Sequence, residues 1–197
     1  MPAIPLIGRP APPVVTARLL LRPAEVADAS AVLAYIADNR EFLAPWEPRR
    51  TAGYYTRASV DDLIRWEARE RDGGGCNRFY LYPADAPDRI IGMVNLANFV
   101  HGASLRCTVG YALAERAQGR GFMTEALRGV VAYCFDKLQL HRVEAAYLPR
   151  NERSAAVLRR VGFGVEGFAR DYLLIDGKWE DHILTAITNP SWSSDGR

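Results

Sequence analysis

Apolar residues recur along the chain with two different spacings, which predict a mixture of helices and strands. A spacing of three or four residues predicts helices over Glu25–Asp38, Ser59–Asp72, Met123–Leu138 and Ser154–Val161. Short apolar runs bounded by turn residues predict strands over Thr16–Arg22, Phe79–Tyr82, Ile90–Asn98, Leu105–Leu113, Arg142–Tyr147, Phe168–Ile175 and Lys178–Ile187. This pattern predicts an α+β (or α/β) domain with about four helices around a mixed, mostly antiparallel sheet.

Local signals set the expected ends of these elements. Ser59 followed by Asp62 has the spacing of a capping box, so a helix is expected to begin there. Residues 39–50 are expected to be irregular because Pro45 and Pro48 interrupt them. Asp176–Gly177 predicts a two-residue turn that joins the last two strands as a hairpin.

Length and composition favour one soluble domain. The chain has 197 residues, of which 49% are hydrophobic and 24% charged, and this is ordinary for a globular protein. We expect the domain to cover residues 16–188, between a flexible tail of residues 1–15 and a second tail of residues 189–197. No apolar run predicts a signal peptide or a membrane span.

Charge and metal-binding residue types narrow the function classes. A net charge of +2 argues against a purely electrostatic nucleic-acid binder, so direct DNA binding is not expected. Three widely spaced cysteines predict neither a disulfide framework nor a metal clip, which favours a cytoplasmic protein. The three histidines lack close spacing with carboxylates, so no metal site is expected.

A glycine turn past the middle of the chain predicts a phosphate site. A strand that ends near Leu113 leads through Gly119 and Gly121 into a helix, and amides at such a helix start attract anions. Arg116 and Arg120 add positive charge around the turn. No lysine follows the second glycine as in a P-loop, and no third glycine completes a dinucleotide fingerprint. We therefore expect a pyrophosphate site that is neither a P-loop nor a dinucleotide-binding motif.

A second constellation, Asn151 and Ser154, stands at the entry to the last predicted helix. Asn151 suits the N-cap position and Ser154 the first turn, which would be a sufficient structural reason for both residues. The alternative is that both residues serve the same ligand as the glycine turn. The residues by themselves leave the two interpretations open.

Several motifs together resemble one known family. Arg116–Gly121 resembles the Arg/Gln-x-x-Gly-x-Gly/Ala loop of the GNAT acyl-CoA N-acetyltransferases. Phe42–Pro48, Asn151–Ser154 and Asp171–His182 resemble the RimJ/RimL branch, and most closely the RimJ type of ribosomal-protein-alanine N-acetyltransferase. The similarity covers Thr16 to Trp192, and its C-terminal half is the more specific part.

The resemblance implies a fold, a co-substrate and its binding residues. The fold would be the GNAT fold, with a sheet that splits between its two central strands and holds acetyl-CoA in the opening, without a metal. The backbone of Val109, Gly110 and Tyr111 is implied in binding the pantetheine arm of acetyl-CoA. The other residues implied in acetyl-CoA binding are Arg116, Gln118, Gly119, Arg120, Gly121, Met123, Thr124, Asn151 and Ser154. Ser154 would in addition assist departure of the thiolate.

The resemblance also implies an acceptor, the N-terminal α-amine of a ribosomal protein. An α-amine has a pKa of about 8 and is partly neutral near pH 7, whereas a lysine amine at about 10.4 is not. The absence of a conspicuous strong base therefore suits an α-amine. Glu47, with Glu41 and Glu115 as further candidates, could remove a proton through water, and Phe42, Trp46 and Glu47 would line the acceptor groove.

Two alternatives remain open from the sequence. One is acetylation of a small amine such as an antibiotic, a polyamine or an amino acid. The other is a non-catalytic acyl-CoA-binding or ribosome-assembly module. Clustered arginines in the N-terminal third suit association with a ribosome: Arg49, Arg50, Arg57, Arg65, Arg69 and Arg71. The sequence does not choose between a monomer and a homodimer.

Overall fold

The computed structural model describes residues 12–193, and parts of both expected tails lie outside this range. Inside it, Val14–Val15 form strand β1, which pairs with Leu20 and Leu21 although it belongs to the expected tail. At the other end the indole of Trp192 meets the ring of His141 edge-on at 5.6 Å. The described structure thus includes residues 12–15 and 189–193, which the sequence had assigned to the two tails.

Eight strands form one sheet in the order β1-β2-β3-β4-β5-β6-β8-β7. Their bounds are Val14–Val15, Leu19–Arg22 (β2), Cys76–Pro83 (β3), Gly92–Val100 (β4), Arg106–Leu113 (β5), Arg142–Tyr147 (β6), Gly164–Ile175 (β7) and Lys178–Thr188 (β8). All neighbours pair antiparallel except β5 and β6, which run parallel. The expected mixed, mostly antiparallel sheet is confirmed.

The two parallel strands separate after a short stretch of pairing. Arg106, Cys107 and Thr108 of β5 pair with residues 142–144 of β6. Beyond that point β5 continues to Leu113 and β6 to Tyr147, and the two strands no longer pair with each other. The sheet therefore opens between its two central strands, as the sequence led us to expect.

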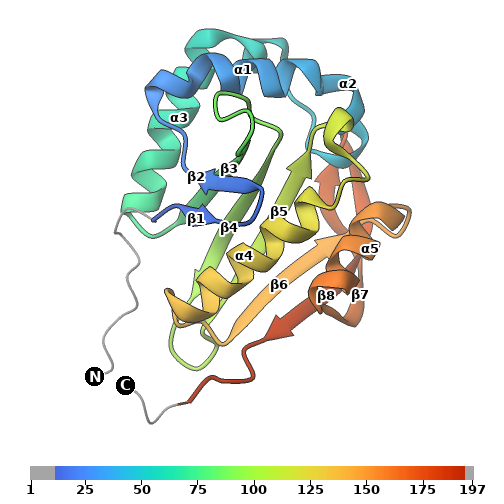
Figure 1. The fold of residues 1–197 in the computed structure, drawn as a ribbon. Coiled ribbons are helices and arrows are strands. Elements are labelled where there is room, and N and C mark those ends of the chain that lie inside the picture. Colours follow the sequence, from blue (N-terminus) through green and yellow to red (C-terminus); the bar gives the residue numbers. More distant parts are fainter. Residues whose placement is uncertain (1–11, 194–197) are drawn as a thin grey trace.

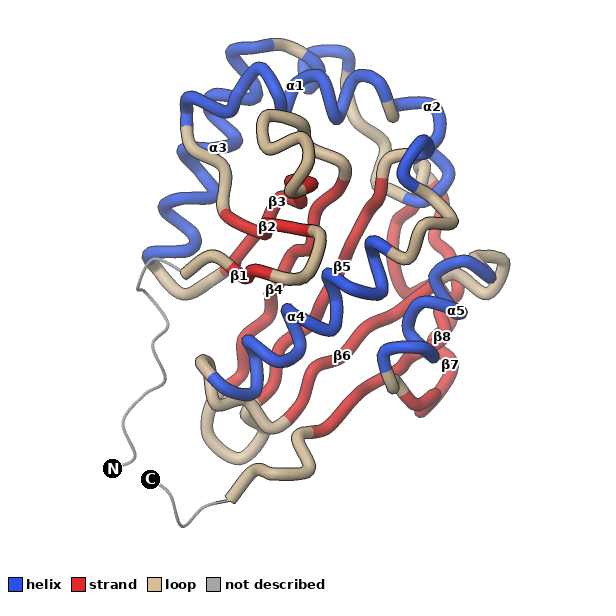
Figure 2. The backbone as a smooth tube through the Cα atoms, viewed as in Figure 1, coloured by secondary structure: helices blue, strands red, loops and turns tan. Residues whose placement is uncertain are grey.

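Helices cover both faces of the sheet. The α-helices are α1 (Ala29–Asp38), α2 (Arg40–Leu43), α3 (Arg57–Asp72), α4 (Phe122–Asp136) and α5 (Glu152–Val161). Phe79 of β3 meets Tyr133 of α4 edge-on, whereas the next residue, Tyr80, donates to Glu67 of α3. Because successive strand side chains point to opposite faces, α3 and α4 lie on opposite sides. Figure 1 shows α4 running diagonally across the sheet, and Figure 2 shows the same arrangement as a tube.

Two expectations for the N-terminal half were wrong in detail. The second helix begins at Arg57, not Ser59, because Thr56 is its N-cap and accepts a hydrogen bond from the Ser59 amide. Residues 39–50 are not wholly irregular, since they contain α2 and the 3-10 turn Ala44–Trp46. With the short helix α2, residues 12–193 contain five α-helices, in agreement with the expected number of about four.

Candidate active site

A two-part cleft opens where β5 and β6 separate. The larger part, about 1250 Å³, lies between α4, α5 and the turn before β2. The smaller part, about 120 Å³, lies between α2, the end of β5 and the start of α5. Both parts share the lining residues Leu113, Gln118, Met123, Arg153 and Val157. A molecule of two chemically different halves could therefore extend through both.

The glycine turn forms the floor of the larger part. Gly119 and Gly121 have φ of +73° and +78°, a region that side-chain-bearing residues rarely adopt. A Cβ added at Gly119 would meet no protein atom within 4 Å, because this position faces open space. The helical bond from the Glu125 amide to the Gly121 carbonyl leaves the preceding amides of α4 without intrahelical acceptors. The turn thus has the backbone geometry that accepts an anion.

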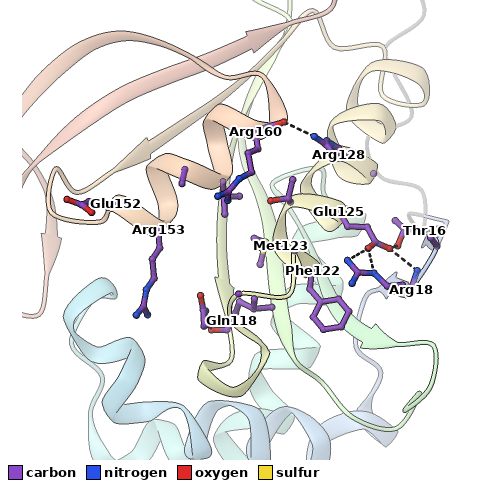
Figure 3. Close-up of a pocket in the computed structure, with 18 residues that line it drawn as sticks. Thr16, Arg18, Gln118, Phe122, Met123, Glu125, Arg128, Glu152, Arg153 and Arg160 are labelled. Atoms are coloured by element: carbon purple, nitrogen blue, oxygen red, sulfur yellow. Dashed lines mark hydrogen bonds and ion pairs between the residues drawn. The ribbon is translucent and has the colours of Figure 1, made fainter.

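Arginines that the sequence did not single out line the same space. Arg128 of α4 and Arg153 and Arg160 of α5 lie around the larger part of the cleft (Figure 3). Arg128 also donates to the Arg160 carbonyl at 2.9 Å, which links the two helices. In sequence these arginines look like the solvated face of an amphipathic helix. Their cationic groups and the helix N-terminus fit an anionic ligand with several phosphates.

Asn151 and Ser154 take the expected cap positions and also line the cleft. The Asn151 side chain accepts a hydrogen bond from the Ser154 amide at 3.0 Å, so the expected N-cap is confirmed. Both residues line the smaller part of the cleft. The two interpretations of this pair are therefore compatible.

Ser154 has a partner that sequence reasoning missed. Its Oγ lies 2.7 Å from the Tyr111 hydroxyl, which also donates to the Ser154 carbonyl at 3.2 Å. Burial raises the pKa of Tyr111 to about 12, although the hydrogen bond with Ser154 acts in the opposite direction. This phenol therefore keeps its proton at neutral pH. The contact joins β5 to α5 across the opening in the sheet.

The far end of the smaller part has apolar walls and one carboxylate. Phe42, Leu43 and Trp46 line it together with Glu47. Burial raises the pKa of Glu47, while Arg50 and Arg78 oppose the shift through their charges. Among the lining residues of this part, Glu47 is the only acidic one. The sequence had named Phe42, Trp46 and Glu47, and the structure brings them together with Ser154.

Some of the expected residues lie away from the cleft. Arg116 lines separate hollows near α1 and the turn after β3. Val109, which was expected to act through its backbone, has a buried side chain. The Arg120 guanidinium lies over the Phe122 ring at 4.8 Å and also faces a separate hollow. Glu115 lies beside Arg116 in one of these hollows. Gln118, Gly119, Gly121, Met123 and Thr124 do line the cleft.

Residues 12–193 contain neither a candidate metal cluster nor a membrane-spanning helix. Within this range no group of three or more His, Cys, Asp or Glu side chains could hold a metal ion. No helix in the same range is long and apolar enough to cross a membrane.

Comparisons with known proteins agree with this geometry. Residues 18–164 match the model of the acetyltransferase (GNAT) domain family. A relative from Escherichia coli (strain K12), [ribosomal protein uS5]-alanine N-acetyltransferase, is 39% identical over 178 residues, which are 90% of this chain and 91% of the relative. A probable N-acetyltransferase of Bacillus subtilis (strain 168), YjcK, is also 39% identical, over 87% of this chain and 94% of the relative.

Solved structures show the same architecture. The ribosomal-protein-S5-alanine acetyltransferase from Vibrio fischeri superimposes with a TM-score of 0.86 and 34% identity, over 92% of this chain and 99% of that one. Mycobacterium smegmatis RimJ in complex with CoA-disulfide superimposes with a TM-score of 0.81 and 34% identity, over 86% of this chain and 81% of that one.

Proposed function

Because the chain belongs to the acetyltransferase (GNAT) domain family and is an acetyl-CoA-dependent N-acetyltransferase, we propose that it acetylates the N-terminal α-amine of a ribosomal protein. The resemblance and the GNAT fold expected from the sequence are confirmed by the family match. The alternative of a non-catalytic binding module is set aside for the same reason. Identity of 39% to a uS5-alanine N-acetyltransferase supports this choice of acceptor.

The proposed acetyl-CoA site uses both parts of the cleft. Acetyl-CoA supplies a thioester whose acetyl group passes directly to the amine with release of the CoA thiol. In the larger part, amides of residues 119–124 and the arginines Arg128, Arg153 and Arg160 would hold the phosphates. In the smaller part, Asn151 would hydrogen-bond the pantetheine arm near Tyr111 and Ser154. The positive φ of Gly119, which faces open space, supports this fit.

One observation carries the choice of acceptor, namely the single carboxylate among apolar walls. A polyamine or aminoglycoside carries several positive charges and needs several converging carboxylates. Glu47 is the only acidic residue that lines the smaller part of the cleft, where Phe42, Leu43 and Trp46 form apolar walls. Such a pocket suits one amine attached to a small or apolar residue, as at a protein N-terminus.

Glu47 is the proposed base. Its raised pKa, which follows from burial, makes the carboxylate a better proton acceptor than an exposed glutamate. An α-ammonium with a pKa of about 8 loses its proton far more readily than a lysine ammonium. Glu47 would take this proton directly or through one water, so that the amine is neutral when it attacks.

Ser154 and Tyr111 are the proposed donors at the leaving group. Their hydroxyl oxygens lie 2.7 Å apart, and both residues line the smaller part of the cleft. A thiol has a pKa of about 8.5, so its thiolate requires stabilisation by a hydrogen bond rather than a strong acid. The Ser154 Oγ would donate that hydrogen bond to the thiolate sulfur and would itself accept a hydrogen bond from the Tyr111 hydroxyl.

The test is intact-mass spectrometry of ribosomal proteins from cells with and without this protein. We expect one ribosomal protein to be lighter by one acetyl group in the deletion strain, with the change mapped to its N-terminal residue. The chain as it stands should restore the acetyl group, whereas a Glu47→Gln variant, folded and expressed equally, should restore little of it.

One outcome would contradict the proposed acceptor and another the proposed base. Unchanged ribosomal proteins, together with CoA release from small free amines in vitro, would identify a small-amine acetyltransferase. Full restoration by the Glu47→Gln variant would keep the acceptor and remove the proposed base. An assay of the purified protein with two peptides, identical except that one has a blocked α-amine, distinguishes acetylation of the α-amine from acetylation of lysine.

A further inference from the structure

A cluster of polar contacts ties the start of β2 to the first turn of α4. Glu125 accepts hydrogen bonds from the Thr16 hydroxyl at 2.6 Å and from the Arg18 amide at 2.8 Å, both on Oε1. Its Oε2 accepts from Arg18 Nε at 2.7 Å and lies 2.6 Å from Nη2. We call these three residues the clasp (Figure 3). Arg18 and Glu125 are 107 positions apart, so only the tertiary fold brings them together.

The clasp also reaches the glycine turn itself. Arg18 Nη1 donates to the Arg120 carbonyl at 3.0 Å, and the Arg18 guanidinium lies 4.6 Å from the Phe122 ring centroid. In a trans peptide the carbonyl of one residue and the amide of the next point in opposite directions. Holding the Arg120 carbonyl towards Arg18 therefore directs the Gly121 amide away from Arg18. Gly121 has positive φ, and glycine has more accessible backbone conformations than any other residue. A contact from outside the turn therefore restricts the conformation of this peptide more than it would at another residue.

The chemistry of Glu125 is unexpected for an anion site. All three clasp residues line the larger part of the cleft, where the diphosphate of acetyl-CoA is proposed to bind. Burial would raise the pKa of Glu125, but hydrogen bonds from Thr16 and Arg18 outweigh it and lower the pKa. A carboxylate that stays ionised here repels a diphosphate, so a role in direct binding does not explain it.

We propose that Thr16, Arg18 and Glu125 are positioning residues that fix the Arg120–Gly121 peptide and so preorganise the glycine turn for the diphosphate. This inference rests on the proposed role of residues 119–124 in acetyl-CoA binding. Arg18 supplies the contact with the turn, and Glu125 with Thr16 holds Arg18 in place. The benefit is that the turn loses little conformational freedom when the ligand binds.

Glu125→Gln distinguishes a positioning role of the clasp from direct phosphate binding by Arg18, because the two roles predict opposite changes in CoA affinity. If Arg18 bound phosphate directly, removing the competing carboxylate would leave CoA affinity unchanged or increase it. If the clasp positions the turn, the variant loses one of the two acceptor oxygens that hold Arg18, and CoA affinity falls. We expect a fall of about tenfold, the usual effect of losing a hydrogen bond to a charged group.

The experiment is isothermal titration of the purified chain with CoA, for Glu125→Gln, Arg18→Lys and a matched control, Arg22→Lys. Arg22 makes the same set of contacts outside the cleft: an ion pair with Asp28, a bond to the Pro23 carbonyl and a stack on Tyr82. The first two variants should bind CoA about tenfold more weakly. Arg22→Lys should bind it as the unaltered chain does.

Kinetics provide the second measurement. With saturating acetyl-CoA, kcat of Glu125→Gln should stay within about twofold, because the clasp touches no reacting atom. Its kcat/KM for acetylpantetheine, which lacks the diphosphate, should match that of the unaltered chain. CoA affinity equal to or above that of the unaltered chain would overturn the proposal, as would an equal loss with both thioesters. Failure of the unaltered chain to bind CoA would overturn the proposed function itself.

Discussion

The hydroxyls of Ser154 and Tyr111 lie close enough to act as one unit, so neither residue's contribution can be judged alone. Ser154 stands in the first turn of α5 and Tyr111 in β5, on opposite sides of the opening in the sheet. The pattern Asn-x-x-Ser made Ser154 visible in the sequence. Nothing in the sequence indicated that the Tyr111 side chain, rather than its backbone, would face the same site.

Replacing either hydroxyl should slow turnover more than it weakens acetyl-CoA binding. We expect Ser154→Ala and Tyr111→Phe each to lower kcat by about ten- to a hundredfold, with the KM for acetyl-CoA within about threefold. The double variant should be about as slow as the slower single variant, since both remove one donor unit. Release of CoA thiol measures all three. Multiplicative losses, or equal losses of kcat and affinity, would contradict a shared role.

Glu47 should show opposite effects on activity and stability. Burial raises its pKa in the folded state, so folded protein holds the proton more tightly than unfolded protein does. The stability associated with this group is full below the unfolded pKa of about 4.3 and is lost as pH rises through the folded value. Glu47→Gln should therefore be more stable than the unaltered chain at pH 7 but not at pH 4. The free energy of unfolding in urea at the two pH values measures this.

The same substitution tests the catalytic assignment. If Glu47 is the base, kcat/KM of the unaltered chain falls on the acid side of its raised pKa, and Glu47→Gln loses this limb together with most of the activity. Arg50→Ala removes a charge that lowers the Glu47 pKa, so it should move the limb to higher pH. If the pH dependence of kcat/KM is the same in both variants as in the unaltered chain, Glu47 is excluded as the base.

At the scale of elements, local capping signals were informative but not always unique. Asn151 was correctly predicted as the N-cap of α5, because no competing polar residue lies at a suitable offset before it. For α3 both Thr56 and Ser59 are good caps, and the chain uses Thr56 because the turn Ala52–Tyr55 delivers it in an extended conformation. Helix existence followed from periodicity, whereas this helix start depended on the preceding turn.

Asn151 allows capping and ligand binding to be separated. Asn151→Ala removes the acceptor of the Ser154 amide and should lower the free energy of unfolding by about 1 kcal/mol. Asn151→Asp keeps a capping oxygen and should keep the stability. If the amide also binds pantetheine, both variants should raise the KM for acetyl-CoA. An aspartate variant with normal KM and stability would leave Asn151 as a cap alone.

At the scale of the whole molecule, three distant segments meet at the smaller part of the cleft, where the acceptor is proposed to bind. Arg150, just before α5, donates to Glu180 of β8 at 2.8 Å and to the Pro45 carbonyl at 3.3 Å. The Asp176 amide in the hairpin turn donates to the Glu47 carbonyl at 3.0 Å. The C-terminal hairpin thereby supports the segment that carries Trp46 and Glu47.

Loss of Arg150 should therefore affect the acceptor more than acetyl-CoA. We expect Arg150→Ala to raise the KM for an acceptor peptide by about three- to tenfold and to leave the KM for acetyl-CoA within about twofold. Arg142→Ala is the control, because Arg142 pairs with Glu144 and Glu166 at the other end of β6. Steady-state kinetics with both substrates measure this. Equal changes in the two KM values would show that Arg150 supports the fold generally.

The sequence by itself determined the elements whose causes are local. Apolar spacing predicted the main helices and strands, and the turn at Gly119 and Gly121 predicted an anion site, because backbone freedom and helix capping depend on neighbouring residues. Motif order then indicated the family. None of these signals required contacts between distant residues.

Only the tertiary structure decided which distant side chains share the cleft. Tyr111 meets Ser154 because β5 and β6 separate after three pairs, and Arg18 meets Glu125 because β2 lies beside α4. Arg116, which precedes the two glycines, and Arg120, which lies between them, face other hollows instead. The physical reason is that such contacts depend on how the sheet and the helices pack against each other. Local periodicity predicts single elements, but it does not predict which residues of different elements come into contact.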